Sequence, residues 1–264
     1  PVIDADESRS HLFQITGSRG GIRAYQKPGS SVPLWSVTTI LGQTIAKPAL
    51  LNWYNKQGRE AVADKLSSSV GQTLTQEALD LAIQEAGKRP EKTKDSAAAL
   101  GSRAHDLISE YITNKIEDND KSVSVPRELS DVWDSFLQFE EEFGIYKWLA
   151  SEFGIYSESW GYAGSVDALC LTRDGKFMLI DFKTSKALYP EHSMQVCAYA
   201  NALSYPLSLY PLYHGMIQEW NTWENIHPYV VRLGKDAPEF EARRVMHPQA
   251  ALDAFLNTLQ LYKA

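Results

Sequence analysis

Residues 171–186, LTRDGKFMLIDFKTSK, contain the triplet Asp-x-Lys twice, and such a triplet can take part in metal-dependent cleavage of phosphodiester bonds. At average composition the triplet occurs by chance about once in 300 positions, so its surroundings must decide whether it carries chemistry. The first copy, Asp174-Gly175-Lys176, lies between two β-patterned segments. Because Asp-Gly is a strong signal for a type I′ hairpin turn, we interpret this copy as a turn at 174–175.

The second copy, Asp181-Phe182-Lys183, ends the apolar run 177–180, which is typical of a strand buried on both faces. Side chains alternate along a strand, so Asp181 and Lys183 are expected on one face and Phe182 on the other. A buried carboxylate and ammonium are costly unless they pair with each other or with a metal. A structural ion pair and a metal site are therefore the two interpretations of this triplet.

A third charged residue, Asp167, lies in the preceding β-patterned segment. With the turn at 174–175, residue 167 is predicted opposite residue 182, which brings Asp167 near Asp181 and Lys183. Carboxylate oxygens suit Mg²⁺ or Mn²⁺, and a lysine beside them can orient a water molecule. The arrangement predicts metal-dependent hydrolysis of a phosphodiester bond.

The order of these residues, with others along the chain, resembles the PD-(D/E)XK nuclease superfamily, specifically its RecB-like branch. The match covers about 95–205 and extends weakly to the N-terminal part, which looks like phage-type and mitochondrial genome maintenance exonucleases. Its elements are a helical histidine in LGSRAH (His105), the motif Gly164-x-x-Asp167, the motif Asp181-x-Lys183-Thr184, and Gln195-x-x-x-Tyr199. The first motif is Ser-Val-Asp here rather than Pro-Asp.

The resemblance implies a role for each matching residue. Metal ligation is implied for Asp167 and Asp181, helped by the Phe182 carbonyl, His105 and Glu152. Glu158 competes with Glu152 for the same position. Lys183 would position the water and stabilise developing charge, while Gln195 and Tyr199, which share a helical face, would hold the site or the substrate strand.

Composition limits the class of protein. The chain has 264 residues with 44% hydrophobic content, a net charge of −7 and a pI near 5.4, which argues against a protein that coats nucleic acid nonspecifically. No apolar run reaches the roughly 20 residues of a membrane helix and no export signal is visible, so we expect a soluble, cytoplasmic protein. The two cysteines, Cys170 and Cys197, cannot hold an iron–sulfur cluster and are expected to be reduced core residues.

The pattern of elements predicts an α/β fold with a single domain over 1–264. Helices are expected from Pro48, over 74–87, from Asp95 or Ser96, from Pro126, and over 191–205 and 247–264, with a loop at 88–95. Strands are expected near 22–25, over 148–159, 162–172 and 176–185, and at 215–220 and 228–233. The resemblance implies a restriction-endonuclease-like mixed central sheet flanked by helices, with 1–94 as an N-terminal helical elaboration of a 95–264 nuclease core.

The expected partner is DNA, and the expected activity is that of a Mg²⁺-dependent exonuclease on single strands or DNA ends, with Mn²⁺ able to substitute. The alternatives are a structure- or sequence-specific endonuclease, a non-catalytic DNA-binding module with the same fold, and a structural ion-pair cluster in an unrelated α/β protein. Candidate phosphate contacts are Arg103, Lys186, Lys88, Arg89 and Lys92. Tyr25, Trp35 and Trp53 are either base-stacking or core residues.

Overall fold

The computed structural model describes residues 13–16, 23–26, 30–119, 121–203 and 226–264. The chain forms two compact units: unit 1 comprises Pro1–Ile45 and Ala104–Ala264, and unit 2 comprises Ala46–Arg103. Much of the helical part that was expected within 1–94 thus forms a unit inserted into the chain of unit 1.

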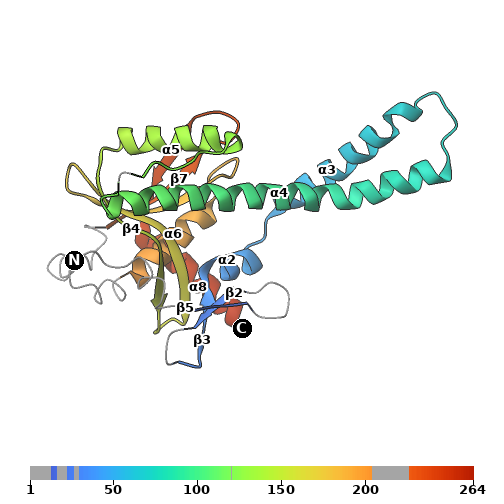
Figure 1. Ribbon diagram of the computed structural model, residues 1–264. Coiled ribbons are helices and arrows are strands. Elements are labelled where there is room, and N and C mark those ends of the chain that lie inside the picture. The colour runs from blue at the N-terminus through green and yellow to red at the C-terminus, as the bar shows by residue number, and fades with distance from the viewer. Residues whose placement is uncertain (1–12, 17–22, 27–29, 120, 204–225) are drawn as a thin grey trace. The chain divides into compact units, whose positions relative to one another are not determined.

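Unit 1 is built on a mixed central sheet flanked by helices, which confirms the predicted α/β class (Figure 1). Strands β3–β5 and β6–β7 pair in parallel, while the remaining neighbours are antiparallel. The order is β1-β2-β3-β5-β6-β7-β8, with β4 paired to β5 outside this path. The strands are β1 (Phe13–Thr16), β2 (Arg23–Gln26), β3 (Pro33–Ser36), β4 (Ile145–Ser157), β5 (Tyr162–Thr172), β6 (Phe177–Lys183), β7 (Ile226–Leu233) and β8 (Phe240–Arg244).

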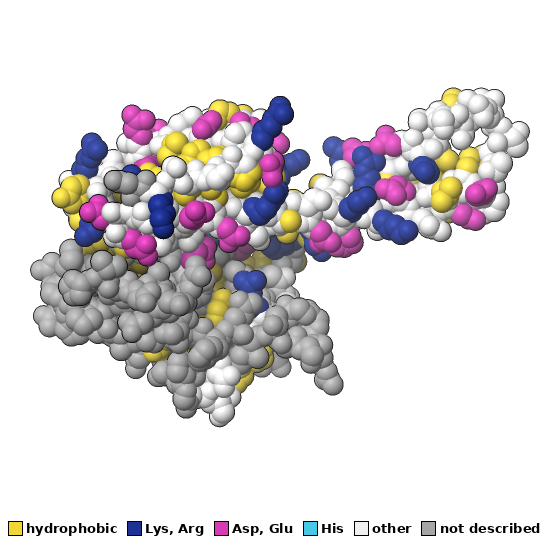
Figure 2. Space-filling view, viewed as in Figure 1, with side chains coloured by type: hydrophobic (Ala, Val, Ile, Leu, Met, Phe, Trp, Pro, Cys, Tyr) yellow, Lys and Arg dark blue, Asp and Glu magenta, His cyan; other side chains and the backbone are white. Residues whose placement is uncertain are grey.

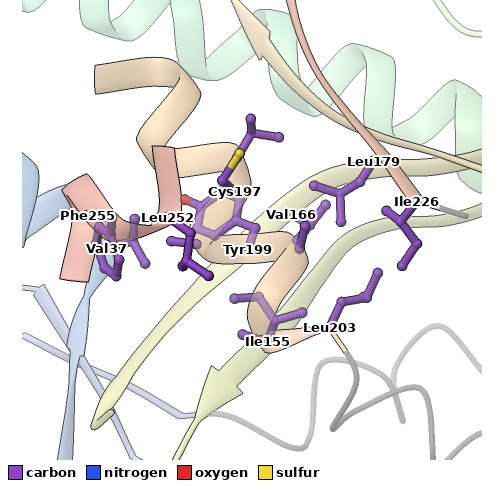
Figure 3. Close-up of a cluster of buried hydrophobic side chains, with 14 of the residues drawn as sticks. Val37, Ile155, Val166, Leu179, Cys197, Tyr199, Leu203, Ile226, Leu252 and Phe255 are labelled. Carbon is purple, nitrogen blue, oxygen red and sulfur yellow. The ribbon is translucent and has the colours of Figure 1, made fainter. Parts of the chain in front are cut away.

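Three helices supply apolar side chains to the largest hydrophobic cluster of unit 1: α2 (Val37–Thr44), α6 (Pro190–Ala202) and α8 (Pro248–Lys263). In Figure 3, Tyr199 and Cys197 of α6 lie among side chains of the sheet, and Val37 of α2 lies beside Phe255 of α8. Burial of this cluster fixes α6 against the strands that carry the acidic residues.

Helix α5 (Ser130–Glu142), which follows the short η2 (Arg127–Leu129), packs its Phe136 and Phe139 rings against Phe182 of β6. The neighbouring residues Asp181 and Lys183 instead contact Gln195 of α6. The predicted alternation along this strand is therefore confirmed.

The turn between β5 and β6 differs from the prediction. The Thr172 amide donates to the Lys176 carbonyl at 2.9 Å, and Gly175 has φ 80°, whereas Asp174 is not among the residues with positive φ. These features describe a three-residue loop with a left-handed glycine, so the predicted two-residue type I′ turn is wrong.

This loop shifts the strand register by one residue. Ala168 pairs with Ile180, and continuing the register by one residue aligns position 167 with 181, where the prediction aligned it with 182. Directly opposite residues share a face of the sheet, and a one-residue shift exchanges the faces. The observed register therefore aligns Asp167 with Asp181.

Unit 2 contains α3 (Pro48–Leu66), the short η1 (Ser67–Ser69) and the first part of α4 (Gln76–Ile116), which belongs to unit 1 from Ala104 onward. The helix that was expected from Pro48 is confirmed. The loop predicted at 88–95 and the helix start at Asp95 or Ser96 are wrong, because α4 is continuous there with Pro90 inside it. The Ala, Glu and Lys residues around Pro90 are strong helix formers. Their helix propensity offsets the free-energy cost of the backbone hydrogen bond that proline cannot donate.

Strands β1 and β3, helix α2 and strand β8 were not predicted. Helix α2, with the sequence VTTILGQT, is only eight residues long and begins with β-branched residues that favour strands. Strand β8, FEARR, is polar and has no apolar alternation. The strand expected at 215–220 lies outside the described residues. None of the described helices is long and apolar enough to cross a membrane.

Candidate metal centre

The site lies where strands β5 and β6 separate. One edge of strand β5 pairs with β4 over the whole strand. The other edge pairs with β6 over Ala168–Leu171 and with β3 at Tyr162 and Ala163. On this second edge, residues 164–167 therefore pair with neither β3 nor β6. Asp167 lies at the start of this gap, and the Phe182 amide donates to Asp167 Oδ2 at 2.6 Å in place of a ladder bond.

Three side chains gather at this gap in a geometry that could hold a cation. One ligand atom from each of His105, Glu152 and Asp167 lies within 4.8 Å of the others. His105 Nδ1 is 3.4 Å from Asp167 Oδ1 and 3.7 Å from Glu152 Oε1. Helix α4, strand β4 and strand β5 each supply one of these residues.

A second network joins the end of β6 to helix α6. Lys183 Nζ lies 2.7 Å from Asp181 Oδ2 and donates to Gln195 Oε1 at 3.3 Å. Gln195 Nε2 contacts Asp181 Oδ1 at 2.8 Å and the Tyr199 hydroxyl at 2.9 Å. The predicted Gln-x-x-x-Tyr face thus bonds directly to the Asp-x-Lys strand.

The close contact between Tyr199 and β5 depends on a glycine. A Cβ atom at Gly164 would lie 2.5 Å from Tyr199 Cε1, which is closer than real atoms approach. Gly164 therefore leaves the space that the Tyr199 ring occupies, and this explains why the first motif begins with glycine.

Glu152 has an unusual backbone conformation. Its φ is 46°, in the left-handed region that residues with a side chain rarely adopt, although Ser151 and Phe153 pair regularly with β5. Such a conformation costs about 1–3 kcal/mol and persists only where the surroundings enforce it. The Glu152 carboxylate accepts a hydrogen bond from Ser165 Oγ at 3.1 Å, which helps hold it toward the cluster.

Charges in the cluster shift the pKa values of its members. The Asp167 carboxylate raises the pKa of His105 well above its usual value. Burial opposes ionisation of Asp167, but His105 and Lys183 hold the pKa of that carboxyl below its usual range. Burial, with the charge of Asp167, raises the pKa of Asp181 to about 6 despite the neighbouring Lys183.

Lys183 keeps its charge at neutral pH. Burial favours the neutral amine, but the carboxylates of Asp181 and Asp167 outweigh it and raise the pKa of Lys183. Lys183 can therefore donate hydrogen bonds and stabilise negative charge. It is poorly suited to act as a general base, because its raised pKa keeps it protonated.

The residues present fit a hard divalent cation. The Asp181 side chain is 1% exposed, and its two oxygens lie 2.7 Å from Lys183 Nζ and 2.8 Å from Gln195 Nε2. Carboxylates with one imidazole suit Mg²⁺ or Mn²⁺, and the nitrogen ligand favours Mn²⁺.

Phe182 is oriented in keeping with a backbone ligand. Its amide points toward β5, and the amide and carbonyl of one strand residue point to the same side. Glu158, the competitor of Glu152, is exposed in the turn after β4 and is not part of the three-residue group.

The five predicted phosphate contacts belong to both units of the chain. Lys186 is exposed just after β6 in unit 1, whereas the other four belong to unit 2. Arg89 is already paired with Asp64 at 2.6 Å.

The aromatic candidates make contacts inside their own units. Tyr25 is buried, Trp35 packs edge-on against Tyr262, and Trp53 packs edge-on against Tyr54. These contacts support their interpretation as packing residues.

Two polar contacts that were not predicted from the sequence support the site. Ser165 hydrogen-bonds Glu152, and Ser151 donates to the Asp167 carbonyl at 3.2 Å. The spacing of Ser165 from Asp167, two residues along one strand, could have indicated a shared face. No comparable signal exists for Ser151, because its contact depends on the pairing of β4 with β5.

Among known proteins, no family model matches the chain, and no curated protein matches it.

Proposed function

We propose that this chain is a Mg²⁺-dependent deoxyribonuclease, acting as an exonuclease on single strands or DNA ends. The observation that carries the proposal is the meeting of His105, Glu152 and Asp167 with the end of β6, where the buried Asp181 carboxylate lies 2.7 Å from a charged Lys183. A purely structural ion pair between Asp181 and Lys183 would not require the other three residues.

When bound, a divalent cation would polarise a phosphate oxygen and lower the pKa of a water molecule. Asp167, Asp181, Glu152 and His105 would hold it, with the Phe182 carbonyl as a further ligand. The Lys183 ammonium would orient the attacking water and stabilise the negative charge that develops on the phosphate. Gln195 would hold Lys183 in place through its 3.3 Å contact, and Tyr199 would hold Gln195.

The two Asp-x-Lys triplets provide a matched test. Lys183→Ala should lower the cleavage rate of end-labelled DNA about 10²–10³-fold, the loss typical when one charge-stabilising group is removed. Lys176→Ala should leave the rate unchanged, because Lys176 is exposed and pairs with Asp174 in the turn. Linear and circular DNA, single- and double-stranded, should each be incubated with Mg²⁺ and with EDTA.

The substrates separate the alternatives. Cleavage of linear but not circular DNA supports an exonuclease, whereas cleavage of circles indicates an endonuclease. Binding without Mg²⁺-dependent cleavage would indicate a DNA-binding module. If wild type and Lys183→Ala are equally inactive on every substrate and neither binds DNA, the nuclease proposal is wrong.

A further inference from the structure

A pocket of about 370 Å³ lies in unit 1, away from the metal cluster. It is lined by the end of α4, by residues 118, 119, 121–123 and 125, and by the start of α5. Its volume falls within the range of about 300–1,000 Å³ of small-ligand sites. His105 precedes Tyr111 and Lys115 on the same helix by six and ten residues, so the pocket begins about 9–15 Å along α4 from the cluster.

One wall of the pocket is aromatic. Tyr111 and Trp133 pack edge-on with ring centroids 5.2 Å apart, and both remain partly exposed. Trp133 is supported from behind by stacking on the buried Phe136. Val123 and Val125 also line the pocket, so a flat ring can enter between apolar groups.

The remaining lining can bind an anion and hydrogen-bonding groups. Lys115 and Lys121 are exposed, and neither forms an ion pair with a residue that the structure describes. Lys115 lies over the Tyr111 ring at 5.3 Å. Asn114, Asn119 and Ser122 add amide and hydroxyl groups, and Asp118, the one carboxylate among the described lining residues, can accept from an amino or hydroxyl group.

We propose that this pocket binds one nucleotide unit of a single nucleic-acid strand, with the base against Trp133 and the phosphate near Lys115 and Lys121. Stacking on an aromatic ring together with nearby cations is the general way in which single strands are held without sequence preference. On the face drawn in Figure 2, hydrophobic side chains gather between α5 and α4 while Lys and Arg alternate with Asp and Glu around them. Binding there would therefore depend on local groups, since the net charge is −7.

This inference deepens the proposed function, because the pocket would hold the substrate strand at a distance from the metal cluster. The test measures binding in EDTA, which prevents metal-dependent cleavage. The probe is a fluorescein-labelled single-stranded oligonucleotide of about 12 nucleotides, and its anisotropy is followed at several salt concentrations.

The main variant is Lys115→Gln combined with Lys121→Gln, whose exposed positions should tolerate the change. Its matched control is Lys147→Gln combined with Lys176→Gln, which removes the same charge from exposed lysines of unit 1 outside the pocket. The pocket variant should bind about tenfold more weakly than the control at low salt, and the slope of log K against log salt should fall by about 1.4, the value for two lost phosphate contacts. Trp133→Leu, with folding checked by circular dichroism, should weaken binding about tenfold by removing the stacking surface.

Calorimetry with thymidine monophosphate distinguishes a free nucleotide from a strand as the ligand. If wild type releases or absorbs heat on binding the monophosphate and the pocket variant does not, a free nucleotide also enters the pocket. If wild type shows no heat with the monophosphate but the pocket variant loses oligonucleotide binding, the pocket binds the strand alone. Affinities of the pocket and control variants within twofold of each other overturn the inference.

The two proposals fail in different ways. If the pocket variants weaken oligonucleotide binding but wild type shows no Mg²⁺-dependent cleavage, the pocket inference is supported and the nuclease proposal is contradicted. Mg²⁺-dependent cleavage that requires Lys183, with oligonucleotide affinity insensitive to the pocket variants, supports the nuclease and contradicts the pocket inference.

Discussion

Glu152 shows how a single residue can combine strain and function. Its left-handed backbone lies between Ser151 and Phe153, which pair with β5 in one register, and its carboxylate joins His105 and Asp167. Strained backbone conformations of this kind concentrate at functional sites, where the surroundings enforce them. Glu158, the competing candidate, lies in an exposed turn.

Replacing Glu152 should therefore separate stability from metal binding. Glu152→Gly and Glu152→Gln both remove the carboxylate, but only glycine adopts φ 46° without strain. In EDTA, the free energy of unfolding of Glu152→Gly should exceed that of Glu152→Gln by about 1 kcal/mol. Urea denaturation measures this difference, and Mn²⁺ should stabilise both variants less than wild type. Equal stability of the two variants would show that the backbone there carries no strain.

At the scale of elements, the site depends on how closely helix α6 approaches strand β5. The approach is set by Gly164, where the Tyr199 ring occupies the space of a side chain, and Tyr199 then holds Gln195 against Asp181. A change at Gly164 should therefore act through the helix on the metal cluster, without touching any ligand.

Gly164→Ala should lower the free energy of unfolding by about 1–3 kcal/mol, the usual cost of overpacking a buried contact. Gly42→Ala is the control, because no atom lies within 4 Å of a Cβ there and alanine favours the interior of α2, so its stability should rise by about 0.5–1 kcal/mol. Thermal or urea denaturation measures both.

The clash is tested by removing its partner. In a Tyr199→Ala background, Gly164→Ala should lose most of its cost, because the ring that occupies the space is absent. A cost that persists in this background would place its origin in the β5 backbone rather than in the Tyr199 contact.

At the scale of the whole molecule, protons and the cation compete for the same groups. The raised pKa of His105 means that its favourable contact with Asp167 is fully present below the unfolded pKa near 6.5 and is lost as pH rises through the folded value. The pKa of Asp181, about 6, has the same sign, so metal-free protein loses both contributions as pH rises. Metal ligation requires both groups without these protons.

The stabilisation that Mn²⁺ confers should therefore increase with pH. Apparent affinity should rise about tenfold per pH unit from pH 6.5 up to the folded pKa of His105, where only His105 remains to be deprotonated, and should then level off. It should rise more steeply below pH 6, where Asp181 adds a second proton. At 100 times the dissociation constant, Mn²⁺ should add about 2.7 kcal/mol to the free energy of unfolding. Thermal denaturation with and without EDTA measures this effect.

His105→Gln should remove the pH dependence above pH 6.5 while keeping the component below pH 6. Asp167→Asn should abolish the response to Mn²⁺ at every pH, because it removes the carboxylate shared by the cluster. A wild-type affinity that stays constant from pH 5.5 to pH 8 would show that these groups do not ligate the ion; this interval brackets the usual histidine pKa of about 6.5.

By itself, the sequence determined which residues could do chemistry and how they alternate along each element. The Asp181 and Lys183 face, the opposite placement of Phe182, and the shared face of Gln195 and Tyr199 all follow from local periodicity, and the structure shows each of them. These features depend only on the two-residue and 3.6-residue repeats of strands and helices.

Only the tertiary structure decided the register between β5 and β6 and the continuity of α4 through Pro90. A strand register depends on the exact turn, and one additional residue in the loop after Thr172 exchanges the faces of every side chain that follows. The Glu152 conformation and the contact of Tyr199 with Gly164 arise from pairings between segments distant in the chain. Local sequence patterns carry no record of such pairings, because their energy exists only when the segments are packed together.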